Sequence, residues 1–255
     1  MGQVFRIPLP DGAYAPCIEV SAEPEIADAL SQLGVRAGRR ALVIVGGAGK
    51  MADQDEARLR SLFQEGVAPL AAAYDIVVMD GGTDAGVMRL AGQARAHAEA
   101  GFDLIGIAAQ GTVALPGRTG QATDRAPLEP HHSHFVFTPG TEWGDEAPWI
   151  ARVATTLAGD QPSATILING GEIAWQDAAE SVAAGRPVFT VAGSGRTADI
   201  LARAVQGDEA NPRAQALVAS GLINVLNLAD DPAIIKTMLL EALTLPGPED
   251  IDDTK

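Results

Sequence analysis

The chain has 255 residues, 33 of them acidic and 18 basic, which gives a formal net charge of −15 at pH 7. This acidic balance excludes a sequence-independent grip on nucleic acid, which requires a basic face, but a small anion can still be held by backbone amides and one or two arginines. Without a long apolar window or a signal-peptide pattern, and with Cys17 as its one cysteine, the chain is expected to be cytoplasmic and to bind no membrane.

The elements predicted from residue 41 onward alternate between short apolar runs and helical patterns. Strands are predicted at 41–47, 74–82, 103–109, 132–138, 164–170, 186–193 and 221–228. Helices are predicted at 53–73, 85–101, 145–159, 172–185, 196–205 and 231–243. Such alternation implies right-handed crossovers and a mostly parallel sheet that is covered on both faces. The predicted fold class is therefore α/β, a Rossmann-like three-layer sandwich.

The chain divides into three parts in this interpretation. Residues 1–40 form an N-terminal extension in which "CIEV" at 17–20 is a candidate edge strand of the same domain. Residues 41–245 form the Rossmann-like domain, and residues 246–255 form an acidic, flexible tail. We also expect a homo-oligomer, a dimer.

The segment 110–130, "QGTVALPGRTGQATDRAPLEP", is predicted to be a long loop. Loops of this length in compact domains are usually functional or mobile. With Arg118 and Arg125, it could close over phosphates as a lid. The alternatives are a solvated connection or a contact between protomers, and slower hydrogen exchange at 111–127 on addition of a nucleotide would distinguish the lid from them.

Four predicted strands end in glycine: "VIVGGAGK", "VVMDGGTDAGVM", "ILINGGEIAW" and "FTVAGSGRTAD". In a parallel sheet these ends share one edge, at which ligands bind and toward which the following helices point their free amides. Glycine also lets the backbone come close to a ligand. The alternative is that these glycines only make tight turns. If they form a binding edge, the candidate ligand-binding residues are Gly46, Gly47, Lys50, Gly81, Gly82, Thr83, Gly86, His134, Gly170, Gly171, Glu172, Gly193, Ser194, Gly195 and Arg196.

Two familiar phosphate-binding patterns fit these turns poorly. "GGAGK" is not a Walker A loop, because Ile44 and Met51 stand where glycine and Ser or Thr are required. "GSGRTA" fits the short pattern of dinucleotide-binding turns, but the nearest acid after the next strand, Asp230, lies too far on for the usual ribose contact. An NAD-dependent dehydrogenase is therefore poorly supported.

The sequence resembles a known superfamily at several places. "GGTDAGVMRLAGQA" is similar to a glycine-rich segment of the LOG phosphoribohydrolases. "LEPHHSHFVF", "INGGEIAWQDA" and "VAGSGRTADILA" resemble the N-terminal cytosolic region of TRPM channels. Both groups belong to the SLOG superfamily of Rossmann-like domains, and the chain resembles a standalone prokaryotic member of the TRPM-related branch, LSDAT. The resemblance implies a cleft for ADP-ribose-like or other nucleoside-diphosphate ligands.

The chain departs from the LOG pattern where those enzymes carry PGG-x-GT-x-x-E. Asn169 replaces the proline, and Asp177 stands at the position of the glutamate. Aspartate is shorter by one methylene, and bond-cleaving geometry is sensitive to about 1 Å. We therefore expect a nucleotide-binding or sensor protein without a further cofactor. The alternative is a nucleotide N-glycosidase or phosphoribohydrolase in which Asp177 or Glu172 is the catalytic acid/base.

Several single residues leave open alternatives. Arg196 is either a fork for phosphate or a surface charge, and Glu172 either accepts from ribose hydroxyls or complements a helix dipole. His132 and His134 share a strand face, but no further ligand follows at a metal-binding spacing, so we expect no metal and a ligand-facing or hydrogen-bonded position for His134. Trp143, Trp149 and Trp175 are candidates for stacking on adenine; the latter two lie on predicted helices, which favours core packing.

Overall fold

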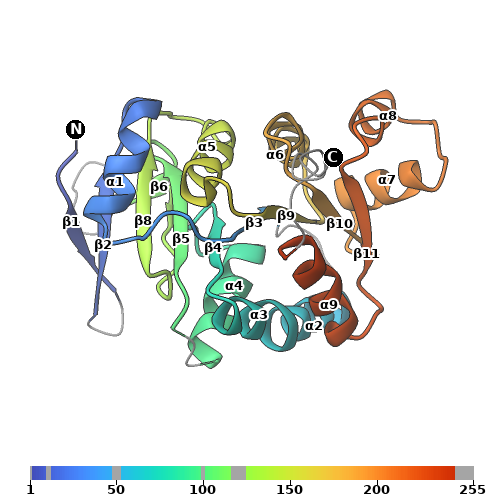
Figure 1. The fold of residues 1–255 in the computed structure, drawn as a ribbon, viewed down its shortest axis with the longest axis horizontal. Coiled ribbons are helices and arrows are strands. Elements are labelled where there is room, and N and C mark those ends of the chain that lie inside the picture. The colour runs from blue at the N-terminus through green and yellow to red at the C-terminus, as the bar shows by residue number, and fades with distance from the viewer. Residues whose placement is uncertain (1, 10–12, 48–52, 99–100, 116–124, 245–255) are drawn as a thin grey trace, which may run out of the picture.

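A single large sheet lies at the centre of the molecule (Figure 1). The computed structural model describes residues 2–9, 13–47, 53–98, 101–115 and 125–244. Within these residues the sheet has the strand order β1-β2-β8-β5-β4-β3-β9-β10-β11. The strands are β1 (Phe5–Pro8), β2 (Tyr14–Glu19), β3 (Ala41–Gly46), β4 (Val77–Asp80), β5 (Leu104–Ala109), β8 (His134–Thr138), β9 (Ser163–Ile168), β10 (Val188–Ala192) and β11 (Ile223–Asn227). Neighbours pair in parallel except β1 and β2. The predicted α/β class with a mostly parallel sheet is confirmed.

The central strands are apolar on both faces because both faces are covered. In β3, Val43 and Val45 belong to one core cluster, whereas Leu42 and Ile44 belong to the other. This alternation follows from the two-residue period of a strand. An unbroken run of apolar residues therefore supplies both cores at once.

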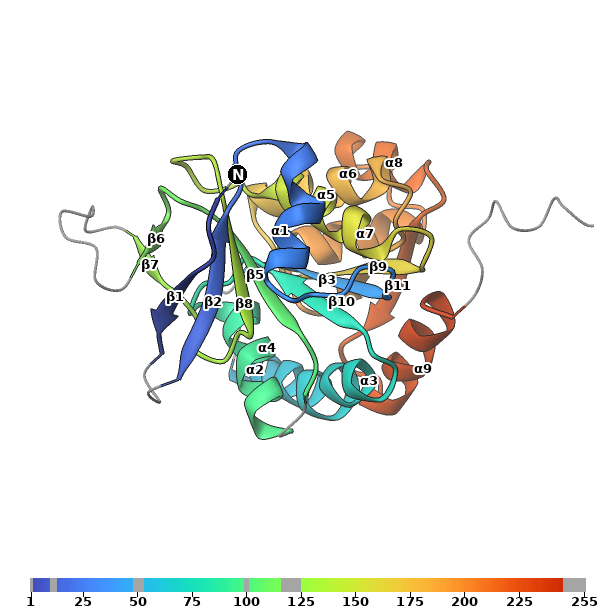
Figure 2. The ribbon, with the colours of Figure 1, turned by 60° about the vertical axis from the view of Figure 1, so that its left-hand side comes forward.

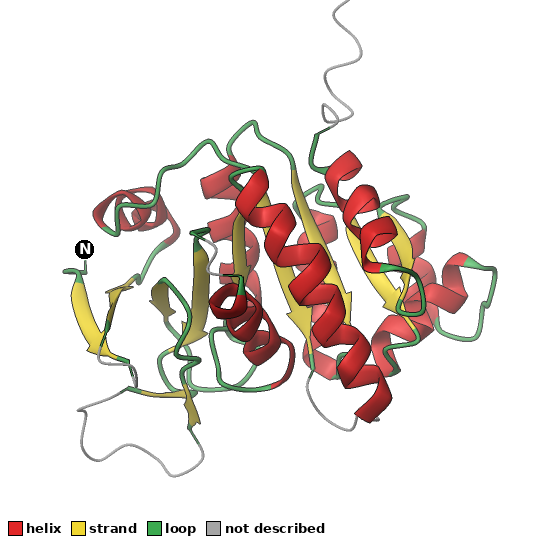
Figure 3. Cartoon of the chain, turned by 90° about the horizontal axis from the view of Figure 1, so that it is seen from below, coloured by secondary structure: helices red, strands yellow, loops and turns green. Residues whose placement is uncertain are grey.

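Helices form the two outer layers (Figures 1 and 2). One layer contains α1 (Ile26–Gln32), α5 (Ala147–Ala158), α6 (Glu172–Ala183) and α7 (Arg196–Val205), with α8 (Pro212–Val218) packed against α6 and α7. The other contains α2 (Asp53–Ser61), the π-helical segment η2 (Leu62–Val67), α3 (Ala68–Ala73), α4 (Gly86–His97) and α9 (Pro232–Ala242), which cross the sheet in the view from below (Figure 3). None of the described helices is long and apolar enough to cross a membrane.

Three segments differ from their predictions. Helix α8 was not predicted, although Asn211 caps it through its side chain and Pro212 starts it, a common signal for a helix start. The strand predicted from residue 132 begins at His134, because the His132 side chain turns to a partner on β4. Residues 5–8 and 14–19 form an antiparallel pair, and β2 joins the main sheet beside β8.

The strand order reverses between β3 and β9. From β3 the chain proceeds outward through β4, β5 and β8, and then returns to place β9 on the other side of β3. In open α/β sheets the loops diverge at such a switch point, which leaves a crevice at the carboxyl ends of the strands. The fold therefore creates a candidate ligand position at the end of β3.

Candidate functional site

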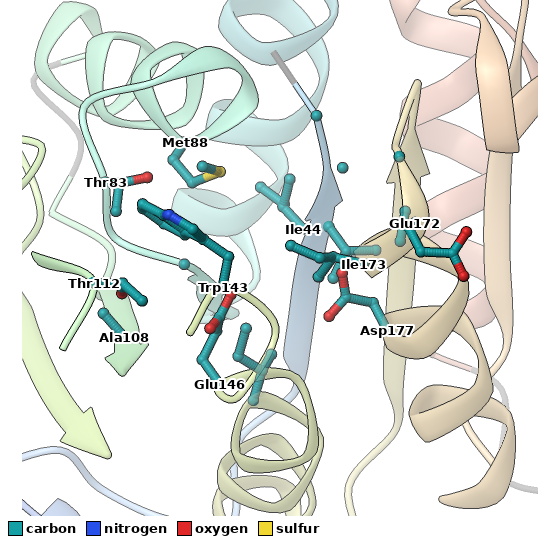
Figure 4. Close-up of a pocket in the computed structure, with 17 residues that line it drawn as sticks. Ile44, Thr83, Met88, Ala108, Thr112, Trp143, Glu146, Glu172, Ile173 and Asp177 are labelled. Atoms are coloured by element: carbon teal, nitrogen blue, oxygen red, sulfur yellow. The ribbon is translucent and has the colours of Figure 1, made fainter. Parts of the chain in front are cut away.

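A cavity of about 290 Å³ lies at this switch point (Figure 4). Its walls come from the ends of β3 and β4, from β5, from the loop before α5, and from the first two turns of α6. The lining residues are Ile44, Val45, Gly46, Gly47, Gly81, Thr83, Met88, Ala108, Thr112, Trp143, Glu146, Ile150, Gly171, Glu172, Ile173, Ala174 and Asp177. The pocket thus combines three of the four glycine-ended strands with three carboxyl groups and one tryptophan.

The predicted glycines occupy different places around this pocket. Gly46, Gly47, Gly81 and Gly171 line it directly, as does Thr83. The others lie outside its lining: Gly82 packs against Gly106 and Phe135, Gly170 lies against Ala174, and Gly86 borders a separate hollow beside Arg60 and Arg89. The glycine-rich edge is therefore partly pocket wall and partly close packing between turns.

The Gly193–Arg196 turn is bonded mainly to the neighbouring turn of β9. The Ser194 hydroxyl is buried, donates to the Val191 carbonyl at 2.6 Å and accepts from the Asn169 amide at 2.7 Å. The Thr197 and Ala198 amides donate to the carbonyls of the β9 turn. The Ser194 hydroxyl thus makes hydrogen bonds within the protein, and its contact with a ligand stays a prediction.

Arg196 is the member of this turn whose side chain lies beside the pocket, outside its lining. It adopts a left-handed conformation with φ of 52°, which costs an L-residue with a side chain about 1–2 kcal/mol. Its guanidinium lies over the turn that begins α6: a Cβ added at Gly171 would be 2.9 Å from Nη2, and one at Gly47 would be 3.8 Å from Nη1. The absence of a side chain at position 171 therefore makes room for the guanidinium beside the pocket.

Glu146 and Asp177 both line the pocket, close enough for the charge of Glu146 to raise the pKa of Asp177. Of these two carboxyl groups, only Asp177 is a candidate from the sequence. Burial raises the pKa of Asp177 to about 8, and the charges of Glu146 and Glu180 add to this rise. Burial also raises the pKa of Glu146. Glu172, by contrast, is directed away from the other labelled side chains (Figure 4) and pairs with Arg213 at 2.7 Å.

A buried histidine joins two carboxylates next to the pocket. The His132 Nε2–H donates to Asp80 at 2.8 Å and its Nδ1–H donates to Glu129 at 2.8 Å, with all three side chains almost fully buried. Asp80 also accepts from the Gly82 amide at 2.7 Å, and the Glu129 amide donates to the Gly82 carbonyl. The cluster Asp80–His132–Glu129 therefore holds the turn after β4, which contributes Gly81 and Thr83 to the pocket. The sequence analysis assigned no such role to His132, because its partners lie 52 and 3 residues away.

The protonation of His132 makes stability depend on pH. Burial disfavours the imidazolium, but the charges and hydrogen bonds of Asp80 and Glu129 outweigh it and raise the pKa of His132 to about 9. A group with a raised pKa stabilises the fold fully below its unfolded pKa, about 6.5 for histidine, and loses this contribution as pH rises through the folded pKa. The raised pKa of Asp177 likewise makes the free energy of unfolding fall as pH rises, up to a pH of about 8.

We therefore expect the free energy of unfolding to fall between pH 6.5 and 9, by about 3 kcal/mol if His132 alone is responsible. Urea unfolding at half-unit pH intervals measures this change. An Asp177→Asn variant should keep the fall above pH 8 and lose part of the fall below it. A flat profile from pH 6.5 to 9 would contradict the imidazolium assignment.

His134 lies outside the lining of this pocket, and its contact with a ligand stays a prediction. It pairs with Ile105 in the sheet, three positions before the pocket residue Ala108 is reached, a distance of about 10 Å along a strand. Its Nδ1 contacts the Ser133 hydroxyl at 2.8 Å, so the hydrogen-bonded alternative describes it. Among the described residues, no cluster of His, Cys, Asp and Glu is arranged to hold a metal ion.

Two of the three tryptophans pack with the core and one lines the pocket, in line with the elements predicted to carry them. Trp149 and Trp175 pack with the core of the α5–α6 layer, beneath Arg152 and Arg213 respectively. Trp143 is 49% exposed and lines the pocket. Only one of the three candidate stacking residues is thus available to a ligand in this cavity.

Two predicted cations cannot be placed. Lys50 and Arg118 lie outside the described residues, as does the middle of the proposed lid, 116–124. The described ends of that loop form the short parallel pair β6 (Val113–Ala114) and β7 (Ala126–Pro127), and Thr112 lines the pocket. The loop therefore starts at the pocket, and its closure remains a prediction.

Comparison with known proteins gives one result at the level of the family. A family model described as SLOG in TRPM, prokaryote, matches residues 39–236. No curated protein matches the chain. The matched region runs from the residues before β3 to the first half of α9 and so includes every strand and turn that lines the pocket.

Proposed function

The chain belongs to the prokaryotic SLOG-in-TRPM family, and from this premise we propose that it is a sensor that binds an ADP-ribose-like nucleotide at the carboxyl edge of its sheet. Membership of the family indicates a nucleotide-related ligand-binding role. The finer assignment, a nucleoside diphosphate held beside Arg196, is our proposal.

The observation that carries this proposal is the conformation of Arg196. Its left-handed backbone costs free energy, and its guanidinium meets the Gly171 turn at the first residues of α6. Backbone strain of this kind is concentrated at functional sites, where it positions a side chain. Helix α6 has no side-chain cap at its start, whereas Asn211 and Asp231 cap α8 and α9. A phosphate bound here would meet a guanidinium fork and a free helix N-terminus together.

Removal of this guanidinium should weaken ADP-ribose binding. We expect Arg196→Ala to cost about 1–3 kcal/mol of binding free energy, because a charge-assisted hydrogen-bonded fork is lost. Titration calorimetry with the wild type and the variant measures the difference. Arg203→Ala is the matched control, since Arg203 lies on the same helix and pairs with Asp208. Equal affinity in Arg196→Ala and wild type would exclude Arg196 as the phosphate-binding residue.

A second candidate function is N-glycosidic cleavage of a nucleotide. The observation that favours it is Asp177, whose raised pKa keeps a proton on a pocket carboxyl near neutral pH, as a general acid requires. Incubation with nucleoside monophosphates and ADP-ribose, followed by chromatography for free base, tests this function. Release that is lost in Asp177→Asn but kept in Glu172→Gln would establish a hydrolase, and the absence of release would leave the sensor.

A further inference from the structure

The pocket pairs apolar walls with acidic groups and offers no described cation of its own. Ile44, Met88 and Ile173 provide apolar surface, and Glu146 and Asp177 bring carboxyl groups to it. None of its described lining residues is lysine or arginine. A phosphate inside this cavity would lie close to carboxyl groups, whereas Arg196 lies outside the cavity lining. These charges favour one orientation of a bound nucleotide, with its phosphates toward Arg196 and its ring in the pocket.

Trp143 presents its ring to the same cavity. In Figure 4 its indole lies beside Thr83 and Met88, above Glu146. The residues around it bond to one another: the Gly144 amide donates to Glu146 at 3.0 Å, and Asp145 accepts from the amides of residues 141 and 142. The Trp143 ring is half exposed, and hydrogen bonds between its neighbours shape the loop that carries it.

Resting on the proposed nucleotide-binding function, we infer that the pocket receives a flat, positively charged ring joined to the ligand's sugar, of the N-glycosyl pyridinium class, stacked on Trp143 with Glu146 and Asp177 balancing its charge. Tryptophan is the aromatic residue that attracts cations best. The cavity volume of about 290 Å³ is at the lower end of the range of about 300–1,000 Å³ for ligand pockets. It therefore encloses one ring and part of its sugar, and the rest of a dinucleotide extends toward Arg196.

The ionisation of the two carboxyl groups supports this inference. Burial raises the pKa of Asp177, with contributions from the charges of Glu146 and Glu180, and burial together with Asp145 raises that of Glu146. Among the described residues, no positive charge contributes to either pKa in the direction that would favour the ionised form. A cationic ring supplies that charge, lowers the pKa of both carboxyl groups and releases a proton, whereas a neutral ring does not.

Four ligands that share ADP-ribose and differ at one end test the inference by calorimetry at pH 7. They are NAD⁺, with a cationic ring; NADH, with a neutral one; ADP-ribose, with none; and nicotinic acid adenine dinucleotide, with an added carboxylate. We expect NAD⁺ to bind at least tenfold more tightly than the other three. Measurements in buffers of different ionisation enthalpy should show proton release with NAD⁺ and none with ADP-ribose.

Variants identify the groups responsible. Trp143→Ala should reduce NAD⁺ affinity to that of ADP-ribose and leave ADP-ribose affinity nearly unchanged, whereas Tyr74→Ala, an exposed aromatic outside the pocket lining, should change neither. Asp177→Asn should abolish the proton release. If NAD⁺, NADH and ADP-ribose bind equally well, the cationic-ring inference is overturned while the proposed function stands. If none of the four binds, both are overturned.

Discussion

A His132→Ala variant should lose about 3–5 kcal/mol of its free energy of unfolding, because it leaves Asp80 and Glu129 buried without their shared positive charge. Both carboxylates are almost fully inaccessible and each lies 2.8 Å from a nitrogen of His132. Removal of the imidazolium therefore imposes the desolvation penalty of two carboxylates in place of a compensated cluster. Denaturant unfolding of the variant and the wild type at pH 7 measures the loss.

His131→Ala is the matched control for this variant. His131 also bonds to Glu129, at 2.7 Å, but its own side chain is 40% exposed, and Glu129 keeps its buried partner His132 when His131 is removed. We therefore expect a loss of about 0–1 kcal/mol. The penalty in His132→Ala should shrink at acidic pH, where Asp80 and Glu129 can take up protons. A loss below about 1 kcal/mol at pH 7 would show that the cluster does not support the turn after β4. Because that turn lines the pocket, the variant should also bind ADP-ribose more weakly.

The second large effect is expected at the end of β3, where Gly46→Ala and Gly47→Ala should behave differently. Gly46 has φ of 149°, and a Cβ there would lie 2.0 Å from the Ile168 carbonyl oxygen. A methyl group at this position must push β3 and β9 apart, so we expect a loss of about 3 kcal/mol or more of the free energy of unfolding. Thermal and urea unfolding of both variants measure the difference.

Gly47→Ala should instead affect the ligand. Its Cβ would be 3.5 Å from the Gly170 Cα and 3.8 Å from Arg196 Nη1, which are ordinary contacts. Stability should therefore change by less than about 0.5 kcal/mol, while the methyl group occupies the space between the pocket and Arg196 and lowers ADP-ribose affinity. Equal stability of the two variants would contradict the close approach of β3 and β9, and unchanged affinity in Gly47→Ala would place the phosphates elsewhere.

Much of the site could be anticipated because glycine turns follow strand ends in a βαβ arrangement. Gly46, Gly47, Gly81 and Gly171 were predicted from local patterns, and Asp177 from the resemblance to the LOG motif; all five line the pocket. His134 lies outside this lining; a two-residue period specifies the face of a strand but not which end of the sheet a residue reaches.

Glu146 carried no local signal. Glu146 and the stacking candidate Trp143 lie in a loop after β8 and enter the pocket only because α5 crosses from β8 back to β9. The Asp80–His132–Glu129 cluster joins residues that are 52 positions apart. An acidic residue beside a predicted turn looks the same in a sequence whether water or a buried imidazolium surrounds it.

The sequence by itself determined the α/β class, the covered parallel sheet and the family, because apolar periodicity and glycine-ended strands are local properties of the chain. Only the tertiary structure decided which strands are neighbours, that Arg196 leans over Gly171, and that His132 bridges two buried carboxylates. The reason is physical: these features depend on burial and on the charges of groups that are distant in the chain, and the free energy of a buried charge is set by the groups that surround it in space.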